Sequence, residues 1–154
     1  MRRLVMAASA ALALSIPAGA VIVGGAAPAW AGSSVMCTGL KGTITTTVTI
    51  SKCSPSGGKG YKSASAPSSS LATGGSVTWS KSGATTTIGN VNTTSPGQGP
   101  CKKGSTEYVF TGTVTAASTS GTGIPAVGDA VSGSACVASK GGKISLAPGT
   151  TMNL

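Results

Sequence analysis

Two acidic residues carry the only side-chain carboxylates of the 154-residue chain, and they limit the catalytic chemistry available to it. Glu107 and Asp129 stand beside eleven basic residues, and the chain contains no histidine. Without an imidazole there is no base for a Ser–His or Cys–His nucleophile pair. A glycosidase-type pair needs two carboxylates about 5–10 Å apart, and nothing in the sequence favours that arrangement. We therefore expect no enzyme, no catalytic residue, no metal site and no cofactor.

One serine–lysine pair has the spacing of a nucleophile motif. Ser56 and Lys59 form the string S-x-x-K. In the serine enzymes that use this string, it stands at the start of a helix and companion motifs accompany it. Here it lies among glycines at 57, 58 and 60, and the companion motifs are absent. We interpret the pair as part of a flexible loop.

The four cysteines have the spacing of disulfides. They follow one another at separations of 16, 48 and 35 residues, whereas zinc sites use close pairs such as C-x-x-C. An even number of cysteines in a small exported domain predicts two bridges. Of the three possible pairings we favour the one in which each bridge ties a strand to its close neighbour. It joins Cys37 to Cys53 and Cys101 to Cys136.

Lysine dominates the charge of the chain. The formal net charge is +9, and arginine occurs only at positions 2 and 3. Five loosely grouped lysines are candidate contacts for an anionic partner, such as a cell-wall polymer or lipid head groups: Lys52, Lys59, Lys62, Lys102 and Lys103. Scattered lysines that maintain solubility and protect strand edges are the alternative. We expect no nucleic-acid partner, because such partners call for arginines and stacking aromatics.

Residues 42–50 read G-T-I-T-T-T-V-T-I between two of the cysteines. This alternation predicts one half-buried β-strand, with Ile44, Val48 and Ile50 on its buried face. Its other face would carry threonines at 43, 45, 47 and 49. Regular threonine arrays occur on ice-binding faces, which need several stacked ranks. Since threonine is also a favoured exposed strand residue, we favour an ordinary solvated face.

Further alternating runs predict an all-β domain without helices. We expect strands at 42–50, 61–66, 76–80, 84–88, 107–116, 129–139 and 143–147. Residues 71–75 would be a connection, 90–100 a loop, and 148–154 an edge segment or frayed end. Trp79 and Phe110 are expected in the core and Tyr108 near its edge. The fold this favours is an antiparallel β-sandwich of about seven short strands with two disulfides, with a small β-barrel as the alternative.

The first 31 residues have the features of a secretory signal peptide. Arg2 and Arg3 precede an apolar run over 4–16, and A-W-A at 29–31 is a cleavage site of small residues. We expect cleavage after Ala31 and a single secreted β-domain over 32–154. An uncleaved membrane anchor is the alternative, but Pro17 breaks the run below a comfortable span.

Three stretches resemble those of small secreted β-proteins of actinobacteria. They are C-T-G-L-K-G-T-I-T at 37–45, W-S-K-S-G-A-T-T-T at 79–87 and G-D-A-V-S-G-S-A-C at 128–136. The resemblance implies a location in the cell envelope or outside the cell, and it transfers no functional residue.

Two functional hypotheses follow. The first is an exported, non-enzymatic β-sandwich of the cell envelope or extracellular space that binds anionic wall components. The alternative is a small secreted inhibitor or ligand-binding module that uses an exposed loop such as 54–60 or 94–104. The oligomeric state stays open.

Overall fold

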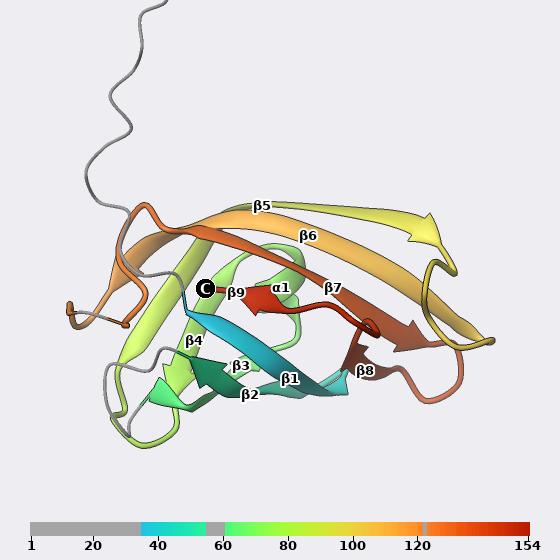
Figure 1. Cartoon of the computed structure of the whole chain (residues 1–154), viewed down its shortest axis with the longest axis horizontal. Coiled ribbons are helices and arrows are strands. Elements are labelled where there is room, and N and C mark those ends of the chain that lie inside the picture. The colour runs from blue at the N-terminus through green and yellow to red at the C-terminus, as the bar shows by residue number, and fades with distance from the viewer. Residues whose placement is uncertain (1–34, 55–60, 122) are drawn as a thin grey trace, which may run out of the picture.

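The computed structural model describes residues 35–54, 61–121 and 123–154 (Figure 1). The predicted signal peptide, Ser56 and Lys59 lie outside the described residues. The elements are β1 (Met36–Thr43), β2 (Thr47–Ser54), β3 (Ser63–Pro67), α1 (Ser69–Ala72), β4 (Gly75–Trp79), β5 (Thr85–Gly97), β6 (Ser105–Ala117), β7 (Ala130–Ala138), β8 (Lys143–Leu146) and β9 (Met152–Asn153).

The strands form one closed barrel, and the predicted sandwich is wrong. Strands β1 to β8 pair in chain order, every pair is antiparallel, and β8 pairs back onto β1. The closing pair joins Lys41 to Ser145, across most of the chain. A sandwich and a barrel share the same alternation along each strand and differ in whether such an edge pairing closes the sheet. No local sequence pattern predicts this edge pairing.

The last wall strand is interrupted. β8 pairs with the end of β1, and β9 pairs with its beginning through Met36 and Cys37. Between β8 and β9 the chain leaves the wall, and Ala147 packs on a disulfide. Val35 and Leu154 then exchange two backbone hydrogen bonds of 2.9 Å. The tail over 148–154, expected as an edge or frayed segment, thus completes the wall and ends fully buried at Leu154.

One end of the barrel is filled by aromatic side chains. Trp79 is fully buried, and its ring centroid lies 5.3 Å from that of Tyr61. The Trp79 indole donates a 2.9 Å hydrogen bond to the hydroxyl of Thr86, and the Tyr61 and Thr119 hydroxyls lie 2.6 Å apart. Trp79 and Phe110 are core residues, as the sequence predicts. We call the end of the barrel that Trp79 and Tyr61 fill the closed end.

Residues 42–50 form a hairpin, and the single strand predicted there is wrong. β1 ends at Thr43 and β2 begins at Thr47. Within the turn, the Thr43 and Thr46 hydroxyls lie 2.7 Å apart, and Ile44 is exposed. The turn has none of the glycine, proline or asparagine that marks most turns, so the alternation hides it. The four threonines therefore do not line one face of one strand.

Two further elements differ from the prediction. Residues 69–72 form the short helix α1, where no helix was expected. The predicted loop from Asn90 onward is largely strand, because β5 continues to Gly97. Asn90 has a φ of 51° at a shift in the β5–β6 register. This is a β-bulge, which bends a strand without ending it, and its Asn and Gly residues imitate a turn signal.

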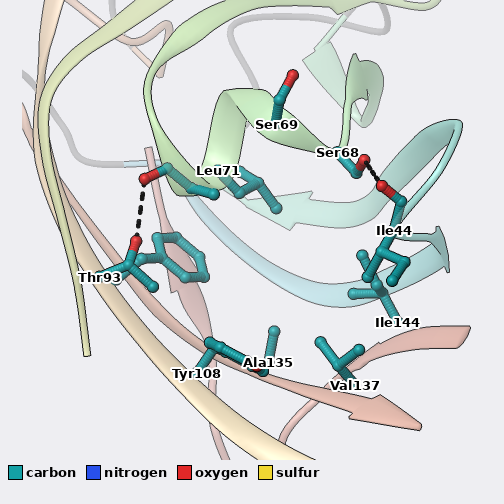
Figure 2. Close-up of a pocket in the computed structure, with 11 residues that line it drawn as sticks. Ile44, Ser68, Ser69, Leu71, Thr93, Tyr108, Ala135, Val137 and Ile144 are labelled. Atoms are coloured by element: carbon teal, nitrogen blue, oxygen red, sulfur yellow. Dashed lines mark hydrogen bonds between the residues drawn. The ribbon is translucent and has the colours of Figure 1, made fainter. Parts of the chain in front are cut away.

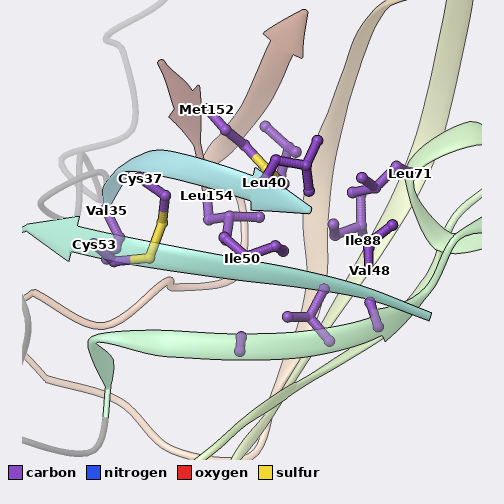
Figure 3. Packing of buried hydrophobic residues seen from close by; sticks show 14 of the residues in the cluster. Val35, Cys37, Leu40, Val48, Ile50, Cys53, Leu71, Ile88, Met152 and Leu154 are labelled. Carbon is purple, nitrogen blue, oxygen red and sulfur yellow. A yellow bond between two sulfur atoms is a disulfide. The ribbon is translucent and has the colours of Figure 1, made fainter. Parts of the chain in front are cut away.

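Both favoured disulfides are present. Cys37 and Cys53 are opposite each other in the β1–β2 ladder, and their bridge lies beside Val35 and Leu154 in the core (Figure 3). The second bridge joins Cys101, in the β5–β6 loop, to Cys136 in β7. Two disulfides indicate that the protein folds in an oxidising environment.

Candidate ligand-binding cavity

A cavity of about 260 Å³ lies inside the barrel, and neither Trp79 nor Tyr61 lines it (Figure 2). Most of its lining is apolar. The lining residues are Ile44, Ser68, Ser69, Leu71, Ala72, Thr93, Tyr108, Phe110, Ala135, Val137 and Ile144. They come from the β1–β2 turn, α1 and strands β5 to β8, so segments far apart in the chain build one site. We call the end of the barrel that contains the cavity the open end.

Small residues opposite large ones leave the space free. On β6, Tyr108 and Phe110 are opposite Ala135 and Gly133 of β7. The Phe110 ring lies against Gly133, where an added Cβ would come 2.5 Å from the ring. Ala135 has only a methyl group to offer the interior beside Tyr108. A larger residue at 135 would therefore fill the cavity.

The helix α1 covers the cavity and is held on both sides. The Ser68 hydroxyl donates a 2.7 Å hydrogen bond to the Ile44 carbonyl, and the Thr93 hydroxyl donates one of 3.1 Å to the Ala72 carbonyl. Figure 2 shows both bonds, with Leu71 of α1 between them. β5 pairs with β4 only as far as Ile88. α1 thus bridges a part of the wall where a strand ladder is missing.

Large apolar side chains remain exposed at the rim of the cavity. Ile44 is 53% exposed and Tyr108 is 38% exposed, although both line the cavity. Exposed apolar side chains that gather around a concave site are typical of surfaces that bind a partner or ligand. The rim therefore has the composition of a binding mouth.

Of the five lysines proposed as anionic contacts, the four that the structure describes lie at two different ends of the barrel. Lys102 and Lys103 lie in the β5–β6 loop at the open end, on the right of Figure 1. Lys52 lies near the end of β2, on the left, and the Lys62 carbonyl accepts a hydrogen bond from Cys53 there. Lys59 lies outside the described residues.

Instead, five exposed lysines lie on the segments that meet at the open end, and we call them the basic collar: Lys41, Lys102, Lys103, Lys140 and Lys143. Lys143 pairs with Thr43, the neighbour of Ile44 in the chain. The β7–β8 turn, which contains Lys140, is tied to the β5–β6 loop by a hydrogen bond from Ser139 to Gly104. An apolar mouth and a concentration of positive charge thus occur at the same end.

The two acids are separated and buried. Glu107 is 8% exposed, and its carboxylate accepts a short hydrogen bond from Ser134 beneath the loop at Gly99. The Asp129 carboxylate accepts a 2.8 Å bond from the Ala126 amide. The Asp129 carbonyl bonds Val114, seven residues along β6 from Glu107. At about 3.3 Å per residue, the acids are roughly 20 Å apart, which is too far for a shared catalytic step.

Other kinds of site find little support in the described residues. Within 35–54, 61–121 and 123–154, no three histidine, cysteine or acidic side chains gather as metal ligands. No helix in that part of the chain has the length and apolar character needed to span a membrane.

Comparisons of the chain with family models, curated proteins and solved structures find no match. The resemblance to small secreted β-proteins of actinobacteria therefore stays a prediction, and the case for function rests on the cavity.

The sequence pattern does not reveal the cavity, because it predicts Ile44 on a buried strand face and a connection over residues 71–75. Leu71 was the available signal, because it is an apolar residue isolated among serines and threonines. Tyr108 was correctly expected near the edge of the core.

Proposed function

We propose that this is an exported, non-enzymatic β-barrel that binds a small apolar molecule in the cavity at its open end. The observation that carries this is the cavity itself, whose rim includes two of the large hydrophobic side chains exposed in the described residues, Ile44 and Tyr108. Small β-barrels that enclose a cavity commonly hold one small ligand.

The alternative uses of the molecule have weaker support. An enzymatic function is disfavoured because the two acids of this chain, Glu107 and Asp129, are buried roughly 20 Å apart. A wall-binding surface made from the five lysines first considered is disfavoured, because Lys52 and Lys102 lie at opposite ends of the barrel. Export is supported by the predicted signal segment and by the two disulfides.

The volume sets the size of the ligand. An engineered apolar cavity of about 150 Å³ takes up benzene, so about 260 Å³ accommodates a group of roughly ten carbon atoms. This is just below the range of about 300–1,000 Å³ for drug-sized ligands. Naphthalene is therefore a suitable neutral probe, because it has no charge for the lysines to attract.

Naphthalene binding, followed by NMR shifts of the Ala135, Val137 and Ile144 methyl groups, tests the proposal. We expect saturable shifts at these methyl groups. Ala135→Phe should abolish the shifts at the Val137 and Ile144 methyl groups, which it retains, by filling the cavity. Ala130→Phe, an exposed change on the same strand, should leave binding intact.

Trp79 fluorescence and the circular dichroism spectrum report whether each variant is folded. If Ala135→Phe does not fold, Val137→Phe replaces it, since Val137 is half-buried and lines the same cavity. Absence of methyl shifts in the wild-type protein, or equal binding by a folded cavity-filling variant, would overturn the proposed function.

A further inference from the structure

The cavity and the basic collar occur at the same end of the barrel, and together they specify more than an apolar ligand. We infer that the ligand is an anionic single-chain amphiphile, such as a medium-chain carboxylate, with its chain in the cavity and its acidic group at the mouth among the collar lysines. This inference rests on the proposed function, because it needs the cavity to accept an apolar group.

The shape of the site determines the form of the ligand. Apolar residues from five segments line the interior, and its rim is exposed at Ile44 and Tyr108. A ligand seated there has one end in the barrel and the other in solvent. A molecule with an apolar chain and a polar end meets both requirements.

The charge near the mouth of the cavity is positive. Lys140 lies in the β7–β8 turn, and Lys143 begins the strand that carries Ile144 into the cavity lining. Lys41 lies two residues before the end of β1, where it pairs with Ser145 of β8. All three lysines are exposed. Glu107, the acid at this end, is buried and bonded to Ser134, so the positive charge of the collar stays accessible to a ligand.

The electrostatic field of the lysines attracts an acidic group to the mouth. Like charges around an apolar, low-dielectric opening focus the potential and raise the local concentration of the opposite charge. Lysine side chains can also lay their apolar stems along the rim while the ammonium groups reach a ligand's acidic end. A neutral or cationic head group would forgo this attraction or be repelled.

Calorimetric titrations with decanoate, decan-1-ol and decyltrimethylammonium at low salt test this inference. The three probes share a ten-carbon chain and differ in head-group charge. We expect decanoate to bind about tenfold more tightly than decan-1-ol, which is the combined effect of two or three exposed ion pairs. The cation should bind most weakly, and added salt should reduce the advantage of decanoate.

Matched charge variants locate the head group. Lys140→Gln with Lys143→Gln should bring decanoate to within about threefold of decan-1-ol, because the ion pairs are lost. Lys62→Gln with Lys81→Gln removes the same charge at the closed end and should leave the advantage of decanoate unchanged. Ala135→Phe should abolish binding of all three probes.

The outcomes distinguish failure of the head-group inference from failure of the proposed function. Equal affinity for decanoate and decan-1-ol, or no effect of the collar variant, would overturn the head-group inference while the proposed function stands. No binding by any probe would overturn the proposed function as well. Binding to phosphatidylglycerol vesicles without binding of decanoate would replace the inference with a membrane-surface role.

Discussion

Thr86 is a polar side chain sealed inside the barrel, and its hydroxyl has a defined task. It accepts the hydrogen bond of the Trp79 indole, and both side chains are buried. Valine at 86 would keep the shape but leave the indole N–H without its acceptor. An unsatisfied buried donor costs about 1–3 kcal/mol.

We therefore expect Thr86→Val to lower the free energy of unfolding by about 1–3 kcal/mol, measured by urea denaturation with Trp79 fluorescence. Thr78→Val, an exposed change on the neighbouring strand, should stay within about 0.5 kcal/mol of the wild type. Equal effects of the two variants would show that the indole bond contributes nothing.

Gly133 is a position where an added side chain would collide with the buried Phe110 ring. An added Cβ would come 2.5 Å from the Phe110 ring, which is opposite it in the β6–β7 ladder. We expect Gly133→Ala to destabilise the protein by about 1–3 kcal/mol through overpacking, measured by urea denaturation.

A double-mutant cycle identifies the ring as the cause. In the Phe110→Leu background, which lacks the outer ring atoms, Gly133→Ala should cost clearly less. If the cost is the same in both backgrounds, the backbone and not the ring is what glycine protects.

Single residues were predictable where size and polarity decide their place. Trp79 and Phe110 are large and apolar, and the expectation that they form the core is confirmed. The alternation over 42–50 predicts Ile44 on a buried face as well, and this is wrong. Its position depends on a turn and on a cavity mouth, which side-chain polarity does not report.

Among the elements, α1 governs access to the cavity. The Ser68 and Thr93 hydroxyls each hold it with one hydrogen bond to a carbonyl. Since a hydrogen bond contributes about 1 kcal/mol, removing both should speed naphthalene entry and release by roughly ten- to thirtyfold. Stopped-flow fluorescence of Ser68→Ala with Thr93→Val measures this.

The control for that experiment is Thr73→Val. The Thr73 hydroxyl bonds the Ser69 carbonyl within the same helix and does not cross the mouth. This variant should leave both rates close to wild type. Unchanged rates in the Ser68/Thr93 variant would mean that ligands enter without moving α1.

Elements were predictable where alternation and turn chemistry agree. The strand expected over 107–116 lies within β6, and that over 76–80 nearly coincides with β4. Prediction failed where the two signals disagree. The turn at 44–46 keeps the alternation without turn residues, and the bulge at Asn90 has turn-like residues inside a strand.

For the whole molecule, the two bridges close chain loops of different length. The sequence separations are 16 and 35 residues. The chain-entropy estimate then predicts stabilisation of about 3 kcal/mol for the shorter loop and about 4 kcal/mol for the longer one.

Urea denaturation of two paired variants checks this prediction. We expect losses near those values for Cys37→Ala with Cys53→Ala and for Cys101→Ala with Cys136→Ala. A loss well under about 1 kcal/mol in either variant would mean that its bridge restricts the unfolded chain very little.

The all-β class and the bridge pairing were predictable, because strand patterns and cysteine spacing are local signals. The choice of a barrel over a sandwich was not, since it depends on the pairing of Lys41 with Ser145. The cavity shares this limit, because its lining exists only once the strands between residues 36 and 146 have closed into a ring.

The same closing pair governs the order in which the barrel can fold. β1 finds β2 at once through a short turn, but its other edge gains partners only from β8 and β9, near the end of the described chain. Pairings between such distant residues slow folding. Until closure, β1 presents an unpaired edge that can capture a second chain. Refolding yield should therefore fall as protein concentration rises, because closure within one chain competes with association between chains.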